Sequence, residues 1–159
     1  MGRPARKAET LGTKALRRLG IEFDVLEYDH REKGAEYAAS ALGIHLERFA
    51  KTLVVAIDGE PAFVLMPGDR ELSLRALARS AGARRATMAD PAAAERLTGY
   101  QTGGISPFGS RRELPVHMDA SLLDHERIAL NGGRRGVIVE LSSADVHRVL
   151  DARVSALAA

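Results

Sequence analysis

The sequence predicts a single α/β domain of the α+β type over residues 1–159, with a mixed, strongly curled or barrel-like β-sheet surrounded by helices. Helical and strand-like segments alternate along the whole chain, and no linker or internal repeat divides it. Two strand-like segments meet at Asp58-Gly59, which is a strong signal for a hairpin turn. Because hairpins join antiparallel neighbours, a mixed sheet is favoured over a doubly wound parallel sheet.

Apolar residues at helical spacing, with polar caps or glycines at the ends, predict five helices, at residues 10–19, 35–42, 73–82, 90–99 and 142–157. The apolar face of the first helix consists of Leu11, Ala15, Leu16 and Leu19. In the last helix the apolar spacing continues through Val154 and Leu157. A short helical turn is expected at residues 45–50.

Alternating or continuous apolar runs predict strands at residues 21–25, 51–57, 61–66, 84–88, 114–118, 128–130 and 137–141. The segment 51–57 is nearly all apolar after its first two residues, which is typical of a central strand covered on both faces. The glycine-rich segment 132–136 is expected to link the strands at 128–130 and 137–141.

The composition excludes several classes of protein. An apolar content of 45% and a charged content of 28% are ordinary for a soluble globular domain. No apolar run approaches the roughly 20 residues that span a bilayer, and the basic residues 1–7 are not followed by the apolar segment of a signal peptide. The absence of cysteine removes disulfides, thiolate metal sites and a cysteine nucleophile, and it fits a cytoplasmic location. The scattered histidines lack metal-ligand spacing, so neither a metal nor a cofactor is expected.

Positive charge is gathered locally although the net charge is only +2. After residue 20, three arginine doublets occur, at residues 84–85, 111–112 and 134–135. Two of them flank glycine-rich segments, where the phosphates of a nucleic acid would be held. The low aromatic content of 4% argues against a base-stacking platform, so a nucleic-acid partner would be bound mainly by its phosphates and its shape.

The segment Thr102–Gly109 is a candidate binding loop because it contains three glycines and a proline. Paired glycines permit positive φ and a close approach of ligand to backbone, so their N–H groups can point outward toward an anion or a carbonyl oxygen. An ordinary turn is the alternative. A serine hydrolase with Ser106 as nucleophile is disfavoured, because the residue after such a nucleophile must donate its N–H to the oxyanion and Pro107 has none. In the serine-hydrolase hypothesis, His117 or His125 would be the general base, and Asp119 would orient that histidine.

Two further side chains are candidates for a site. Lys51 opens the most apolar strand, so it either extends its ammonium to solvent from the strand end or holds a phosphate, a carboxylate or a developing oxyanion at a pocket mouth. Tyr28 follows the first strand and is either a core-edge ring or a pocket wall.

Four segments together, in their order and spacing, resemble the YbaK proteins, which are stand-alone relatives of the editing domain inserted in bacterial prolyl-tRNA synthetases. These segments are Lys-Thr-Leu-Val-Val-Ala at 51–56, Ala-Asp-Pro at 89–91, Thr-Gly-Tyr with Gly-Gly-Ile-Ser-Pro at 98–107, and Gly-Gly-Arg-Arg-Gly at 132–136. The resemblance extends from about residue 11 to residue 157 and implies the fold of that family, a mixed, curled or barrel-like sheet surrounded by helices.

The resemblance also implies a function. It implies a cytoplasmic aminoacyl-tRNA deacylase that acts in trans on mischarged proline tRNA, often in company with prolyl-tRNA synthetase. The expected substrate is Cys-tRNA(Pro), or also Cys-tRNA(Cys), with the substrate's own thiol attacking its ester and leaving as a cyclic thiolactone. Removal of another small residue, alanine or serine, by a positioned water remains open, as does a non-catalytic module that binds tRNA or a synthetase.

The family's motifs imply a set of site residues. Its essential lysine falls on Lys51, its functional glycine on Gly103, and its pocket-edge tyrosine on Tyr28. The other expected substrate-binding residues are Gly104, Ile105, Ser106, Pro107, Asn131, Gly132 and Ile138. The chain departs from the family at Asn131, commonly serine, and at Ile138, often aspartate. Because isoleucine cannot form a hydrogen bond, the identity of the amino acid that is removed stays open.

Overall fold

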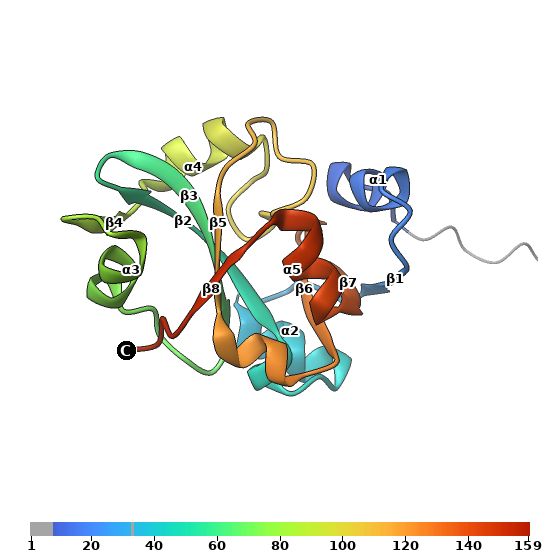
Figure 1. The fold of residues 1–159 in the computed structure, drawn as a ribbon. Coiled ribbons are helices and arrows are strands. Elements are labelled where there is room, and N and C mark those ends of the chain that lie inside the picture. Colours follow the sequence, from blue (N-terminus) through green and yellow to red (C-terminus); the bar gives the residue numbers. More distant parts are fainter. Residues whose placement is uncertain (1–7, 33) are drawn as a thin grey trace, which may run out of the picture.

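Two β-sheets with helices packed around them build the fold (Figure 1). The structure is a computed structural model that describes residues 8–32 and 34–159, so the basic stretch at residues 1–7 lies outside the described residues. Over the described residues the helices are α1 (Leu11–Arg18), α2 (Ala35–Leu42), α3 (Leu74–Ala81), α4 (Pro91–Thr98) and α5 (Ser143–Leu150), with 3-10 turns η1 (Leu46–Arg48) and η2 (Ala120–Asp124). The strands are β1 (Phe23–Glu27), β2 (Ala50–Ile57), β3 (Glu60–Pro67), β4 (Ala86–Met88), β5 (Val116–Asp119), β6 (Arg127–Arg134), β7 (Val137–Ser142) and β8 (Arg153–Ser155).

The larger sheet has the strand order β4-β2-β3-β5-β8, and the smaller one has the order β1-β7-β6. β2 and β3 form the predicted hairpin at Asp58-Gly59, β5 pairs with β3 in parallel, and β8 pairs with β5 in parallel. All pairs of the smaller sheet are antiparallel. An isolated parallel bridge between Phe49 and Ala129 connects the two sheets. The mixed α+β fold is therefore confirmed, although the expected single sheet consists of two sheets.

Helix ends are fixed by the signals that the sequence contains. Thr10, Ser73 and Ser142 each accept a backbone N–H of the first helical turn through the side-chain oxygen. α2 and α3 end at Gly43 and Gly82, whose φ values of 67° lie in the left-handed region.

Three predictions about the elements are wrong. Leu11 and Leu19 do not face the core, since they are 54% and 57% exposed. The last helix ends at Leu150 instead of continuing to residue 157, because Asp151 adopts a left-handed φ of 48° and the chain then pairs with β5 as β8. The glycines at 132 and 133 belong to β6, which carries a register shift between Asn131 and Arg134, so the turn before β7 is shorter than expected.

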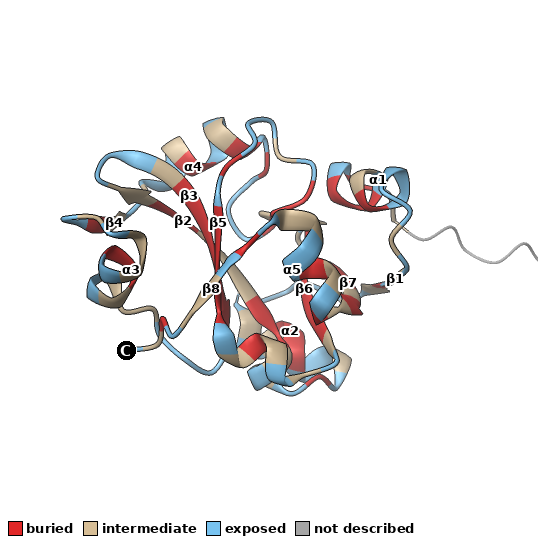
Figure 2. Ribbon diagram, in the orientation of Figure 1, coloured by how far each residue is buried: buried red, intermediate tan, exposed pale blue. Residues whose placement is uncertain are grey.

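The core has three parts, which Figure 2 shows as buried positions on the strands and on the inner faces of the helices. The main part fills the space between the sheets and includes Leu16, Phe63, Leu65, Leu130 and Leu141. A second part lies under α3 and includes Val55, Val64, Met66 and Leu77. The third part packs α2 against the smaller sheet and includes Ala38, Ala39, Phe49, Ala129 and Ile138. This third part forms a wall of the site described next.

Candidate functional site

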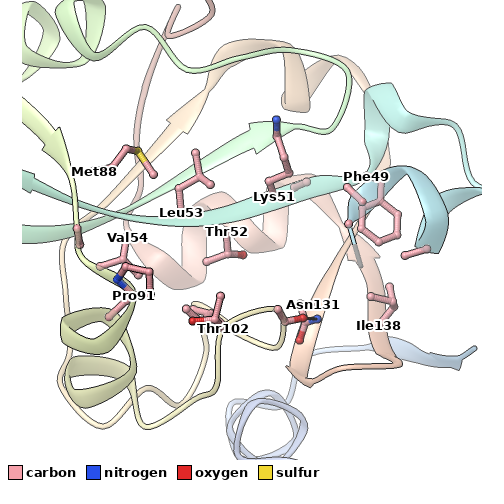
Figure 3. Close-up of a pocket in the computed structure, with 18 of the residues that line it drawn as sticks. Phe49, Lys51, Thr52, Leu53, Val54, Met88, Pro91, Thr102, Asn131 and Ile138 are labelled. Atoms are coloured by element: carbon pink, nitrogen blue, oxygen red, sulfur yellow. Dashed lines mark hydrogen bonds between the residues drawn. The ribbon is translucent and has the colours of Figure 1, made fainter. Parts of the chain in front are cut away.

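A pocket of about 290 Å³ opens along the edge of β2 (Figure 3). β4 pairs only with Val55–Ile57, so among the strands of residues 8–32 and 34–159 none lies beside the first half of β2 on that edge. The carbonyl of Val54 accepts the N–H of Ala89 on the β4 side. Residues two apart in a strand point the same way, so the N–H and C=O of Thr52 face the pocket. The pocket thus meets a stretch of unpaired strand backbone.

The lining of this pocket is mostly apolar, with a few polar groups. Its apolar walls come from α2, β2, β4, α4 and β7 and from Phe49 between η1 and β2, and they include Ala35, Ala38, Val54 and Ile138. Its polar side chains are Tyr28, Lys51, Thr52, Thr102 and Asn131. Among the described residues none supplies a hydrogen-bond partner to the buried Oγ1 of Thr52. An apolar chamber with a few convergent polar groups is the usual form of a small-molecule site.

The loop opposite β2 is held in a tight turn. Gly104 N–H donates to the carbonyl of Gln101 at 2.9 Å, which places Gly103 at the third position of the turn with a φ of +90°. That position needs a positive φ, which glycine adopts without strain. Asn131 Nδ2 donates to the carbonyl of Gly103 at 2.9 Å, and Arg135 Nη2 donates to the carbonyl of Thr102 at 3.2 Å. The β6–β7 hairpin therefore holds the loop against the pocket.

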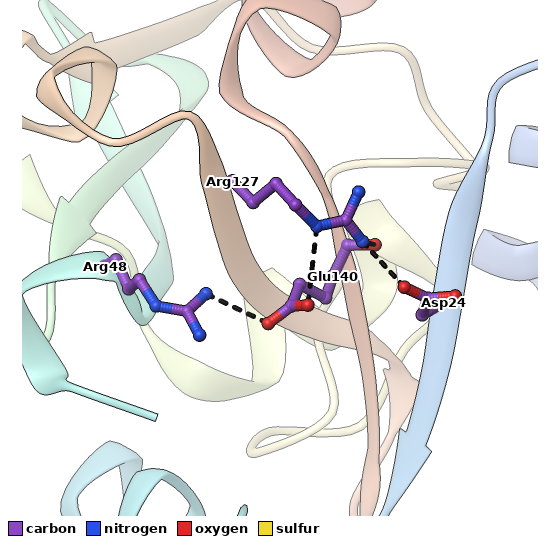
Figure 4. A network of polar contacts seen from close by, with 4 residues as sticks. All are labelled: Asp24, Arg48, Arg127 and Glu140. Atoms are coloured by element: carbon purple, nitrogen blue, oxygen red, sulfur yellow. Dashed lines mark hydrogen bonds and ion pairs between the residues drawn. The ribbon is translucent and has the colours of Figure 1, made fainter. Parts of the chain in front are cut away.

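An ion-pair network ties the apolar walls together behind the pocket (Figure 4). Glu140 accepts from Arg48 Nη1 at 2.9 Å and from Arg127 Nε at 3.4 Å, and Arg127 Nη2 reaches Asp24 at 2.7 Å. Arg48 and Glu140 lie one and two residues from the pocket residues Phe49 and Ile138. The Glu140 side chain is only 19% exposed, so salt screens its ion pairs less than it screens surface pairs. The network fixes η1, and with it the start of β2, against the smaller sheet.

Lys51 lies at the rim of the pocket with its ammonium directed away from it. Its Nζ donates to the carbonyl of Arg70 at 2.8 Å and lies 3.9 Å from Glu71 Oε1. Figure 3 shows the side chain on the opposite side of β2 from Thr52 and Asn131. To reach a group bound beside Gly103, the Lys51 side chain has to leave the Arg70 carbonyl.

Six of the residues expected from the sequence line the pocket together: Tyr28, Lys51, Gly103, Ile105, Asn131 and Ile138. Burial raises the pKa of the Tyr28 phenol, which packs against the ring of Tyr37 with a centroid distance of 6.2 Å. Ile138 is 1% exposed and forms part of the apolar wall.

The other expected residues lie outside this pocket. The N–H of Gly104 is occupied by Gln101, so it does not point to a ligand, and of the two paired glycines only Gly103 lines the pocket. Gly132 is buried, and its carbonyl accepts the hydroxyl of Thr10. Ser106 and Pro107 are buried within the loop. These four residues support the loop and the strand that border the pocket without lining it.

The geometry also speaks against a serine nucleophile. Ser106 is fully buried, and its Oγ accepts the N–H of Phe108 at 3.0 Å. Asp119 is engaged elsewhere, since its Oδ1 accepts the N–H of Leu157 at 2.8 Å. No hydrogen bond joins Ser106 to His117 or His125 in the part of the chain that the structure describes. Ser106 is a structural residue of the loop.

The sequence did not single out several side chains of the pocket. Thr52 stands inside the Lys-Thr-Leu segment and Thr102 opens the candidate binding loop, but neither is among the expected site residues, and no sequence motif points to Phe49 or Ala38. A strand edge that lacks a neighbour is a property of the sheet, so the exposure of Thr52 to a ligand has no signature in the sequence. Over the described residues no cluster of His, Asp and Glu side chains could hold a metal ion, and no helix is long and apolar enough to cross a membrane.

Comparisons with known proteins give this pocket a context. A family described as the aminoacyl-tRNA editing domain matches residues 30–149. EbsC of Enterococcus faecalis, whose name assigns it provisionally as a Cys-tRNA(Pro)/Cys-tRNA(Cys) deacylase, is 35% identical over 109 residues, which are 68% of this chain and 66% of EbsC. The Escherichia coli K12 protein named multifunctional Ser/Thr-tRNA deacylase ProXp-y is 30% identical over 135 residues, which are 82% of this chain and 80% of ProXp-y.

The fold agrees with a solved structure as well. The crystal structure of a candidate trans-editing enzyme for prolyl-tRNA synthetase has a TM-score of 0.87 and 24% sequence identity, and the match covers 96% of this chain and 99% of that one. At this identity the likeness shows the fold alone. The length of the family match and the identities to the two named relatives show that the chain belongs to the aminoacyl-tRNA editing domain family, of the YbaK type.

Proposed function

We propose that this protein is a cytoplasmic trans-editing deacylase that clears mischarged proline tRNA, with Cys-tRNA(Pro) as its first substrate and Cys-tRNA(Cys) as a second. The observation that carries this proposal is the pocket, in which the unpaired Thr52 edge of β2 and the Gly103 turn face a small apolar chamber. An aminoacyl ester of a small residue likewise combines a polar ester group with a small, largely apolar side chain. Family membership and the names of the two relatives support the reaction.

Positioning and electrostatic stabilisation are the means that this site offers. An aminoacyl ester is already activated, so holding it in one reactive geometry supplies much of the required acceleration. No group in the described residues accepts the N–H of Gly103, and this N–H is the donor we assign to the ester carbonyl as negative charge develops on it. We assign Thr52 to the other side of the ester, because its hydroxyl has no partner among the described residues and β4 does not pair with it on that edge.

A cysteinyl substrate can react without a nucleophile from the protein. The thiol sulfur attacks the ester carbonyl, the C–S bond forms, the C–O bond to the ribose breaks, and the thiol proton passes to the departing ribose oxygen. The product is a four-membered thiolactone, which water then opens to cysteine. Phe49, Ala38 and Ile138 form an apolar wall for the side chain, which suits a thiol better than a charged group.

Serine is a second candidate, and one observation favours it. The free Oγ1 of Thr52 is a hydrogen-bonding partner that a substrate hydroxyl can use and that alanine cannot. A seryl substrate, like an alanyl one, would need a positioned water as nucleophile. ProXp-y, named for serine and threonine, is among the relatives.

Lys51 is assigned to the terminal phosphate or to the adenosine end of the substrate. Lys51 lies at the rim of the pocket, and its ammonium can turn toward a bound nucleotide by giving up the Arg70 carbonyl, a neutral acceptor that an anion can replace. We further propose prolyl-tRNA synthetase as a partner, from the resemblance to the editing domain of that enzyme.

The test is deacylation of proline tRNA charged with cysteine, alanine, serine or proline, each at equal concentration. We expect cysteine to be released faster than alanine or serine, and proline to be left in place. Fastest release of serine would overturn the cysteine assignment in favour of the second candidate. Binding of charged tRNA without release of any amino acid would overturn the enzymatic proposal and leave a non-catalytic module. Labelling of Ser106 by a fluorophosphonate would contradict the structural role given to that residue.

A further inference from the structure

A second hollow lies on the far side of the loop that borders the pocket. Its volume is about 630 Å³, and its lining includes His30, Gln101, Gly104, Arg134 and Arg135. The expected site residue Gly104 therefore faces this hollow and not the pocket. Nothing in the chemistry proposed above uses it.

The two hollows share their walls. Thr102 and Gly103 line the pocket, whereas the flanking Gln101 and Gly104 line the second hollow. On the β6–β7 hairpin, Asn131 lines the pocket and residues 133–135 line the second hollow. A ligand that extends across the turn at residues 101–104 would therefore pass from one hollow into the other.

The second hollow has an excess of positive charge. Arg134 is exposed, Arg135 is partly exposed, and neither forms an ion pair with any described residue. The acidic residue in the lining, Glu9, is already bonded to Arg17 at 2.6 Å. The side chain of Arg111 lies against Gly99, which lines the same hollow.

We propose that the second hollow binds the phosphodiester backbone of the 3′-terminal single strand of tRNA while the pocket holds the aminoacyl-adenosine. This inference rests on the proposed function, because the aminoacyl end must occupy the pocket for the strand to cross the turn. Arginine is suited to phosphate through charge-assisted, bidentate hydrogen bonds. Of the two rings in the lining, Tyr100 is buried and His30 is exposed, so at most one base could stack here, and the two arginines make phosphates the main groups held.

The two arginines have different tasks. Arg135 also donates to the carbonyl of Thr102, so a phosphate on Arg135 is coupled to the position of the turn beside the ester. Arg134 has no such bond among the described residues, and its replacement therefore tests phosphate binding without releasing the turn. Arg84 provides a matched control, because it is an exposed arginine that lies outside both hollows.

The experiment measures binding of a fluorescent acceptor-stem minihelix of proline tRNA, with and without its single-stranded CCA end, between 50 and 200 mM salt. We expect Arg134→Ala to weaken binding of the complete minihelix by about tenfold and to lower the slope of log K against log salt by about one phosphate contact. Arg84→Ala should bind like the wild type. Removal of the CCA end should abolish the difference between Arg134→Ala and the wild type.

Equal binding by Arg134→Ala and the wild type would overturn the inference, because Arg134 would then make no contact with tRNA. An equal loss in Arg84→Ala would also overturn it, because the loss would then come from the overall positive charge and not from a site. A loss that persists without the CCA end would place the contact on the duplex and would overturn it too. The proposed function fails separately: a wild type that shows the expected minihelix binding but releases no amino acid contradicts deacylation alone.

Discussion

The side-chain amide of Asn131 joins two segments that are far apart in the sequence, since its Nδ2 donates to Gly103 O at 2.9 Å while its Oδ1 accepts the N–H of Gly133 at 2.8 Å. One residue thus fixes both the irregular part of β6 and the turn that borders the pocket. Asn131→Asp keeps the acceptor for Gly133 but loses the donor and places a carboxylate beside the carbonyl of Gly103. We expect kcat/KM for aminoacyl-tRNA to fall by about tenfold or more, because the turn is released. Steady-state deacylation checks this, and unchanged kcat/KM would show that the turn holds its position without Asn131.

Gly103→Ala should lower activity, because it strains the turn and displaces the Arg135 side chain that is bonded to Thr102. A Cβ at this position would lie 2.6 Å from Arg135 Nε, and the φ of +90° is unfavourable for alanine. Gly59→Ala is a matched control, because Gly59 has a φ of +83° with nothing within 4 Å of its Cβ position. We expect both variants to lose about 1 kcal/mol of unfolding free energy, and only Gly103→Ala to show slower deacylation. Similar activity in the two variants would contradict the role assigned to Gly103.

Lys51→Met tests the ammonium while keeping most of the packing of the stem. If the ammonium holds the nucleotide end of the substrate, we expect kcat/KM to fall by about 100-fold, the size of the loss on removing one critical donor. Glu71→Gln is the control, since Glu71 lies 3.9 Å from Lys51 and its side chain is 90% exposed. It should behave like the wild type. Full activity in Lys51→Met, together with a lower melting temperature, would show that the lysine only stabilises the fold through its hydrogen bond to the Arg70 carbonyl.

Thr52→Val should separate stability from activity. The buried Oγ1 has no partner among the described residues, and an unsatisfied buried hydroxyl costs about 1–3 kcal/mol. Valine has nearly the same shape, so we expect the unfolding free energy to stay equal or to rise, while deacylation falls. Thr52→Ser keeps the hydroxyl and should retain more activity than Thr52→Val. Denaturant unfolding and deacylation are measured on the same preparations, and a valine variant with full activity would exclude Thr52 from the ester site.

His117 should make the protein less stable in acid. Burial, with a smaller contribution from Arg153, lowers the pKa of His117 below its ordinary value of 6.5. Below about pH 6.5 the unfolded chain therefore binds this proton more readily than the folded one, and the unfolding free energy falls as the pH is lowered toward the folded-state pKa. Urea unfolding at pH 7.5 and pH 5.5 should show a smaller loss in His117→Gln than in the wild type. His147→Gln, on the exposed face of α5, should keep the wild-type loss.

Local signals in the sequence determined most of the secondary structure, and six of the ten residues expected at the site line the pocket. Ser73 and Gly82 mark the two ends of α3, and Asp58-Gly59 marks the hairpin, because capping and turn geometry depend on neighbouring residues alone. The apolar strand beginning with Lys51 has neighbours on both sides only along Val55–Ile57, so its composition predicts its place in the sheet only in part. The spacing of apolar residues predicted the wrong element where pairing with a distant segment determined the secondary structure. Val154 continues a helical pattern, yet it pairs with Met118 of β5, because an open sheet edge was available to it.

Only the tertiary structure decided which of the expected residues meet at the pocket. The glycines of the pair at 103 and 104 are equivalent in sequence, but one faces the pocket and the other the second hollow, because Gln101 takes the N–H of Gly104 and closes the turn. The ammonium of Lys51 points to the Arg70 carbonyl and not across the pocket, which depends on where the chain runs after β3. The sequence by itself determined the family and the segments that carry its motifs. The directions of side chains and backbone donors came from contacts between segments far apart in the chain, which no local pattern encodes.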